Sequence, residues 1–295
     1  MAMDQYKYPL SKMSIINSIR DFQAQKLQKK ISGNYDLGII NPKEFKAKEG
    51  QSFFILGSGG SINSLTNNQW SEIEKGFSVG MNKWLIHDFI PDATSLEKNW
   101  HIDFYEQLYN DQRLKASKLK FLFYPAVNVH DYQGFPFKVP PSIIAKIRLH
   151  NGARHILNSR GQLDQFHSDP GYIKKVEEKL RNSGLNFEQK GSVYRLVQFA
   201  LAAGYRHIVF CGIDLNNVTY FWDNNDFLKK RGLESFMLKD QKGKIHATEI
   251  KSEESLPMSE VIQSLQNGLK GKVRFETSSS HSKLAEFLSV WNPQK

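Results

Sequence analysis

The chain has 295 residues, 40% of them hydrophobic and 24% charged, which is the composition of an ordinary globular protein. No apolar run approaches the roughly 18 residues of a membrane-spanning helix, and the start of the chain lacks the apolar core of a signal peptide. The net charge of +10 favours an anionic partner: a nucleotide, a phosphorylated glycan or an anionic lipid surface. We expect no nucleic-acid partner, because the chain lacks zinc-ligand spacing, a helix-turn-helix pattern and an aromatic RNA-binding motif.

Residues 1–50 read as a basic N-terminal extension without strong strand signals. A helix is predicted within 10–30, with one broad apolar side and several lysines and arginines. Such a helix is typical of a peripheral membrane-surface segment. It is equally typical of a helix that packs on its own domain or on another subunit of a homo-oligomer, and we favour this second interpretation.

From residue 51 to 295 the sequence predicts one α/β domain. Strands are expected at 52–57, 77–82, 93–96, 119–124, 206–212 and 272–276, and helices at 65–76, 101–113, 171–183, 192–204, 258–269 and 281–290. This alternation predicts a Rossmann-like, mostly parallel sheet flanked by helices. The only cysteine, Cys211, falls in an apolar strand, so we expect a core role and a reducing, cytoplasmic location.

Two regions interrupt the alternation. Residues 125–170 are rich in Pro, His, Arg and Gly and predict an insertion with little regular structure. Residues 215–255 are first polar and aromatic, then strongly charged. Because long loops inside compact domains are usually functional or disordered, we interpret 215–255 as a lid over the site.

A glycine-rich turn, Gly57-Ser58-Gly59-Gly60-Ser61, follows the first of these strands and precedes a helix. This geometry is typical of phosphate binding. The dinucleotide fingerprint would require a glycine at Ile62 and an acidic residue at Asn82, so the turn indicates a nucleotide-type ligand other than NAD. A second anion-binding position, Gly191-Ser192, opens a later helix; an N-cap alone would account for it equally well.

These blocks, in this order, resemble the bacterial sialyltransferases of glycosyltransferase family 42, which use CMP-activated nonulosonic acids. The blocks are the glycine turn, Met81-Asn82, the segment from Gly191 to Gly212-Ile213-Asp214, and the strand, polar turn and helix from Val273 to Ala285. Together they cover roughly half of the chain. The resemblance implies a glycosyltransferase A-like variant of the Rossmann fold with a lid. It also implies a role in bacterial lipopolysaccharide biosynthesis.

The resemblance also implies a role for individual residues. His246 would be the catalytic base and Tyr220 or Trp222 would support the leaving phosphate. The donor would be held by the glycine turn and by residues at other strand ends: Gly57, Ser58, Gly59, Ser61, Asn82, Gly191, Ser192, Asp214, Thr277, Ser278, Ser279 and Ser280.

Elementary chemistry fits these roles. An acceptor hydroxyl needs a base with a pKa near neutrality, which histidine provides, and His281 is the main competitor of His246. Neutral hydrogen-bond donors and helix ends can stabilise a leaving phosphate without a metal. Because no Asp-x-Asp pair stands at a strand end, we expect no metal and no cofactor beyond the CMP-sugar.

Glu97 departs from the family pattern, which has an asparagine there, and a carboxylate in the donor site would repel an anionic sugar. The sequence therefore predicts a metal-independent, inverting transfer of sialic acid or a related acidic sugar to a hydroxyl of a surface glycan or glycoprotein. Three alternatives stay open at this stage. They are another donor such as CMP-Kdo, a nucleotide-dependent phosphotransferase, and a non-catalytic anion-binding module.

Overall fold

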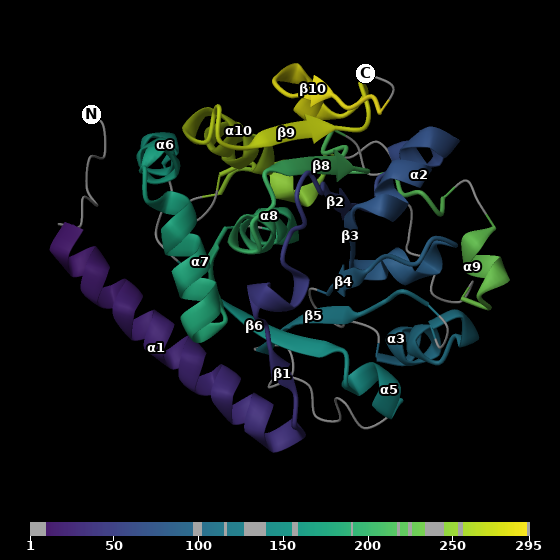
Figure 1. The fold of residues 1–295 in the computed structure, drawn as a ribbon, viewed down its shortest axis with the longest axis horizontal. Helices are drawn as coiled ribbons and strands as arrows, with labels where there is room; N and C mark the ends of the chain where they lie inside the picture. The colour runs from purple at the N-terminus through teal and green to yellow at the C-terminus, as the bar shows by residue number, and fades with distance from the viewer. Residues whose placement is uncertain are drawn as a thin grey trace.

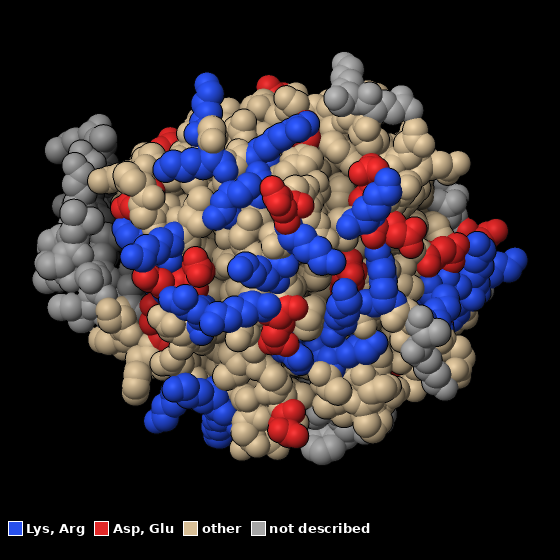
Figure 2. Space-filling view, in the orientation of Figure 1, with Lys and Arg blue, Asp and Glu red and all other residues tan. Residues whose placement is uncertain are grey.

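The structure is a computed structural model in which one mostly parallel sheet lies between two layers of helices (Figure 1). The residues that it describes are 10–96, 102–114, 117–126, 140–154, 159–189, 191–216, 219–223, 226–233, 245–252 and 256–293. On the face drawn in Figure 2, lysine and arginine side chains outnumber the acidic ones, in keeping with the net charge of +10.

The sheet runs in the order β1-β6-β5-β4-β3-β2-β8-β9-β10, with β7 paired to the far end of β6, and every one of these pairings is parallel. The strands are β1 (Gly38–Ile39), β2 (Phe53–Leu56), β3 (Phe77–Met81), β4 (Ala93–Ser95), β5 (Phe121–Pro125), β6 (Ile147–Arg154), β7 (Leu185–Glu188), β8 (His207–Cys211), β9 (Arg274–Thr277) and β10 (Ser289–Val290).

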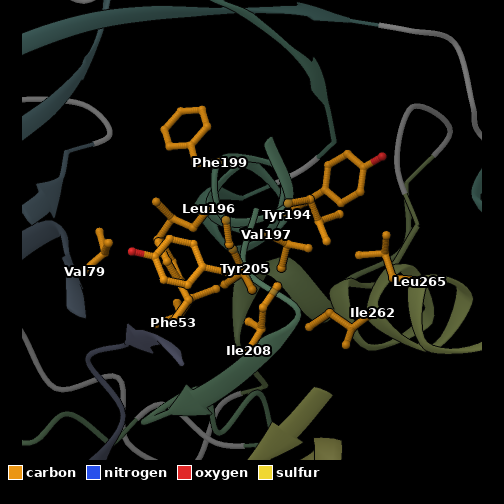
Figure 3. Packing of buried hydrophobic residues seen from close by; sticks show 14 of the residues in the cluster. Phe53, Val79, Tyr194, Leu196, Val197, Phe199, Tyr205, Ile208, Ile262 and Leu265 are labelled. Atoms are coloured by element: carbon orange, nitrogen blue, oxygen red, sulfur yellow. The ribbon is translucent and has the colours of Figure 1, made fainter. Parts of the chain in front are cut away.

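The central strands are apolar on both faces, as expected for a sheet covered on both sides. In β2, Phe53 and Ile55 join one core, whereas Phe54 and Leu56 join the other. The first core is built around a helix whose eleven residues are all buried, Ser192–Ala202 (α8). Figure 3 shows its side chains packed between those of the sheet and those of α10. This helix is consequently fixed at the centre of the domain.

Helices cover both faces of the sheet. The first face carries α8 together with α6 (Arg160–Ser168), α7 (Tyr172–Ser183) and α10 (Met258–Gly268). The second carries α2 (Asn67–Lys75), α3 (Ile102–Tyr109), α5 (Pro141–Ile144) and α9 (Phe227–Lys230). A long helix, α1 (Leu10–Tyr35), runs along the edge near β1 and β6. Short 3-10 turns follow at η1 (Pro42–Phe45), η2 (Gly60–Ser64), η3 (Asn82–Ile86), η4 (Gln112–Leu114), η6 (Ala247–Glu249) and η7 (Lys283–Glu286).

The predicted α/β fold is confirmed, and all six expected strands are present within one or two residues. The expectation of little regular structure in 125–170 was wrong, because α5, β6 and α6 lie there. Charged and polar residues interrupt the apolar run of β6 and hide the strand in the sequence pattern. Arg148 forms an ion pair with Glu44, and His150 is fully buried with its ring against Phe199.

The helix predicted at 281–290 was also wrong. The Ser282 hydroxyl donates to the carbonyl of Ile213 and accepts from the Leu284 amide, which ties this segment to the loop after β8. Only the turn η7 forms there, and β10 then pairs with β9. A long-range contact has therefore replaced the local helical preference.

None of the described helices is both long enough and apolar enough to cross a membrane. The N-terminal helix instead packs against the domain, and β1 adds a short edge strand to β6. Of the two interpretations of this helix, the structure therefore supports packing on its own domain for one face of the helix.

The buried His167 predicts that the protein loses stability in acid. Its ring lies within hydrogen-bond distance of the hydroxyls of Ser264 (2.9 Å) and Tyr194 (3.0 Å), and burial lowers its pKa to about 3. Below pH 6.5 the His167 side chain is protonated in the unfolded chain but stays neutral in the native state, so protons favour unfolding. Between pH 6.5 and 5 this difference lowers the free energy of unfolding by about 2 kcal/mol. Urea denaturation at both pH values checks it.

The matched variants for this measurement are His167→Gln and His281→Gln. The first should be less stable at neutral pH but lose about 2 kcal/mol less than the parent between pH 6.5 and 5. The second changes an exposed histidine and should follow the parent. An unchanged acid dependence in His167→Gln would show that His167 takes up its proton in the native state.

Candidate active site

The candidate site lies where the strand order of the sheet reverses. From β2 the chain proceeds outward through β3, β4, β5 and β6, and then returns to place β8 on the other side of β2. In open parallel sheets, ligands bind beyond the carboxyl ends of the strands at such a switch point. The glycine turn leaves β2 here, and Gly212-Ile213-Asp214 leaves β8 beside it.

The two chains stay in contact after they leave the sheet because each has a glycine at the crossing. The Gly57 amide donates to the Cys211 carbonyl at 2.7 Å. A Cβ on Gly57 would lie 2.4 Å from the Gly212 carbonyl oxygen, and one on Gly212 would lie 2.7 Å from the Gly57 oxygen. Gly212 also has a φ of +67°, in the left-handed region. Neither position accepts a side chain.

Asp214 fastens the end of the turn. Its carboxylate accepts hydrogen bonds from the hydroxyl (2.5 Å) and the amide (3.1 Å) of Ser61, while the Gly59 amide donates to the Gly212 carbonyl at 2.8 Å. The amides of Gly57, Gly59, Gly60 and Ser61 therefore already have protein acceptors. The turn also continues into η2 and the α-helix begins only at Asn67, so the expected helix N-terminus at the turn is not there.

Ser58 is the residue of the turn whose hydrogen-bond donors are not used within the described part of the protein. Its carbonyl accepts the Phe221 amide at 3.0 Å, but within the described residues its amide and hydroxyl have no protein acceptor. The residue is half-buried at the carboxyl edge of the sheet. Of the predicted donor-binding residues in the turn, Ser58 is therefore the one placed to contact a ligand directly.

The start of the predicted lid is bonded to the glycine turn. Gly59 and Tyr220 form an antiparallel bridge, and the Gly60 amide donates to the Thr219 carbonyl at 2.8 Å. The rings of Tyr220 and Trp222 stack at 4.7 Å. Burial, with a further contribution from Asp223, raises the pKa of Tyr220, so its phenol is protonated at neutral pH and can donate a hydrogen bond.

Gly191 and Ser192 start α8 on the same edge. Gly191 has a φ of +91°, and a Cβ there would lie 3.1 Å from the Thr248 methyl carbon, so η6 and its N-cap His246 lie against this helix start. The Ser192 side chain is buried, with 1% exposure. The structure thus brings two predicted parts of the site, Gly191 and the His246 segment, into contact.

His246 is half-buried, and its Nδ1 lies 2.7 Å from the Thr248 hydroxyl. When Nδ1–H donates to that hydroxyl, Nε2 holds the lone pair that a general base needs. The Thr248 amide also points toward Nδ1, at 3.3 Å, and that contact favours the opposite tautomer. The amide can only donate and the hydroxyl can donate as well, so both contacts are satisfied when Nδ1 accepts and Nε2 carries the proton. Nε2 can act as a base only in the other tautomer, in which Nδ1–H donates to the Thr248 hydroxyl.

Glu249 anchors this segment to the rest of the edge. Its carboxylate accepts the amide (2.8 Å) and hydroxyl (2.7 Å) of Ser259 at the start of α10, and it pairs with Lys283 at 2.7 Å. The Lys283 amide in turn donates to the carbonyl of Asp214 at 2.9 Å. Hydrogen bonds therefore connect the glycine turn to the His246 segment through Asp214, Lys283 and Glu249.

The remaining predicted residues lie at neighbouring strand ends. Thr277 ends β9 and is buried, whereas Ser278 and Ser279 are half-buried and Ser280 is exposed in the following turn. Asn82 follows β3 with a φ of +53°, a conformation that asparagine tolerates better than most residues. Glu97 lies outside the described residues.

Sequence reasoning missed two charged residues at this edge, Lys83 and Lys283. Burial lowers the pKa of Lys83, and the Glu249 contact raises that of Lys283. The sequence feature that could have revealed Lys83 is its position directly after Asn82, a predicted site residue. Lys283 lies in the segment 281–290, for which a helix was predicted. Among the described residues, no three His, Cys, Asp or Glu side chains gather as a metal site would require.

The packing of Gly59 gives a direct test of the turn. In Gly59→Ala the new Cβ would lie 2.4 Å from an Asp214 carboxylate oxygen, so the Ser61 contacts must break. We expect a loss of about 1–3 kcal/mol in unfolding free energy, measured by urea denaturation. The control, Gly161→Ala, has nothing within 4 Å of the new Cβ and lies in a helix, so it should be neutral or stabilising. Equal stability of both variants would contradict this account.

Scans of known protein families and of curated proteins found no match. The solved structures to which the chain is similar include three of sialyltransferases from Campylobacter jejuni. For CstII in complex with cytidine-5'-monophosphate, identity is 14% and the TM-score 0.42, over 84% of this chain and 87% of that one. For monofunctional alpha-2,3-sialyltransferase Cst-I the values are 17%, 0.46, 84% and 83%. For an alpha-2,3-sialyltransferase in apo form they are 16%, 0.41, 86% and 85%. At these identities and TM-scores, the similarity does not show the roles of individual residues in this chain.

Proposed function

We propose that this protein is a glycosyltransferase that moves sialic acid or a related acidic sugar from a CMP donor to a hydroxyl of a surface glycan. The observation that supports this most is the connected edge described above. Residues that the family resemblance selects, Ser61, Asp214 and His246, lie there along one hydrogen-bonded path at the switch point of the sheet. Lys283 and Glu249 complete this path.

In the proposed reaction, His246 acts in the tautomer whose Nδ1–H donates to the Thr248 hydroxyl, and its Nε2 takes the proton of the acceptor hydroxyl. The acceptor oxygen then attacks the anomeric carbon of the sugar, the bond from that carbon to the phosphate oxygen breaks, and CMP leaves with inversion. The protonated phenol of Tyr220 donates a hydrogen bond to the departing phosphate, and Ser58 supplies further donors. In our proposal no metal takes part.

The first prediction concerns the nucleotide. CMP should raise the melting temperature of the protein in a thermal-shift experiment, whereas UMP, GDP and AMP at equal concentration should raise it little, because ligands that bind only the native state stabilise it by mass action. Ser58→Ala should reduce the CMP effect without changing the melting temperature of the unliganded protein. Stabilisation by another nucleotide and none by CMP would reject the CMP donor. If CMP does stabilise the protein, transfer assays with CMP-Kdo and with CMP-sialic acid distinguish the two acidic sugars.

The second prediction concerns the base. His246→Ala should reduce transfer by about 10²–10⁴-fold while CMP binding stays nearly unchanged. Thr248→Val keeps the shape of its side chain but removes the hydroxyl that Nδ1–H of His246 needs as its acceptor, so transfer should fall and its pH profile should shift. The control is His281→Ala, which should keep the parent rate, and EDTA should have no effect. Transfer at the parent rate in His246→Ala would remove His246 from this role.

A further inference from the structure

The N-terminal helix α1 is held on the domain by one of its faces. The Gln28 side chain donates to the Leu149 carbonyl at 2.9 Å, Ile31 is buried, and Asp21 forms an ion pair with Lys179. The side chain of Asn151 in β6 also donates to the Ala24 carbonyl, at 3.3 Å. These contacts lie on one side of the helix, so its orientation on the domain is fixed and the opposite side faces outward.

That outward side carries two large apolar residues. Ile19 is 52% exposed and Phe22 is 66% exposed, which makes Phe22 the most exposed large hydrophobic residue of the described chain. Lys26 and Lys30 follow at helical spacing and are exposed as well. An apolar start followed by lysines therefore forms one stripe, which we call the outer stripe of α1: Ile19, Phe22, Lys26 and Lys30.

The charge around the outer stripe has one sign. Between residues 18 and 35 the basic residues are Arg20, Lys26, Lys29 and Lys30, and the only acidic residue is Asp21, which is paired with Lys179 on the inner side. In Figure 2, lysine and arginine side chains project at the lower left edge of the molecule, where Figure 1 draws α1. The outer stripe is thus basic and apolar at once.

We propose that the outer stripe of α1 docks on a bilayer surface rich in anionic phospholipid. Phe22 and Ile19 would enter the boundary between head groups and acyl chains, while Lys26 and Lys30 contact the lipid phosphates, which is the usual arrangement of an interfacial helix. A second copy of the chain fits less well, because a two-fold contact would set basic stripe against basic stripe. Nucleic acid would leave the two apolar side chains without a function.

Docking by this face does not depend on the proposed transferase activity. The contacts of the inner side remain intact, so the helix needs no rearrangement to bind. A bound enzyme would meet acceptors that are attached to lipid at the same surface, but binding to vesicles can be measured without any donor or acceptor. Failure of one proposal therefore leaves the other standing.

The experiment is flotation of the full-length protein with vesicles of phosphatidylcholine alone and with 30% phosphatidylglycerol, at low and high salt. We expect binding only to the anionic vesicles, and weaker binding at high salt. Because each lysine near an anionic surface contributes about fivefold in affinity, Lys26→Gln with Lys30→Gln should weaken binding about 25-fold. Phe22→Ser should weaken binding at both salt concentrations, since its contribution is apolar.

The matched control is Lys229→Gln with Lys270→Gln, which removes the same charge from exposed positions at α9 and beyond the end of α10, away from α1 in Figure 1. It should bind as the parent does. Circular dichroism shows that each variant is folded. The proposal is overturned by absence of binding, by equal loss in both lysine pairs, which would indicate net charge alone, or by a Phe22-dependent dimer in solution without vesicle binding.

Discussion

The close crossing of Gly57 and Gly212 is the contact on which the rest of the site depends. Each glycine leaves room for the backbone of the other chain, and no larger residue fits at either position. The crossing keeps the ends of β2 and β8 together beyond the sheet, where Asp214 can reach Ser61 and the Tyr220 segment can pair with Gly59. The candidate site therefore exists because two backbones pass each other at van der Waals distance.

This contact also changes what the glycine turn means. A glycine-rich turn after a strand suggests amides that wait for a phosphate. Here most of those amides are bonded within the protein, and the glycines serve close packing. In the proposed reaction the donors that would face the ligand are therefore fewer, and they are the donors of Ser58 and the phenol of Tyr220. Such a site suits a phosphate that leaves during the reaction, because it needs only a few well-placed donors at the departing oxygen.

At the carboxyl edge of the sheet, apolar packing and polar contacts hold different parts of the candidate site. The buried helix α8 and the two packed cores hold the strand ends in place. His246 stands on a short turn instead, and it is positioned by hydrogen bonds from Thr248 and, through Glu249, from α10 and Lys283. A polar network of this kind orients the ring, whereas apolar packing alone would fix only its place.

The sequence by itself determined the parallel α/β fold, its six main strands and the order of the motifs, because alternating strand and helix periodicity is a local signal. It did not reveal β6, whose charged and buried polar residues break the apolar pattern, nor that 281–290 forms a short turn and an edge strand. Only the tertiary structure decided that Asp214 binds Ser61 and that Lys283 joins Asp214 to Glu249. These bonds link residues far apart in sequence, and no local preference encodes which of two polar partners will meet.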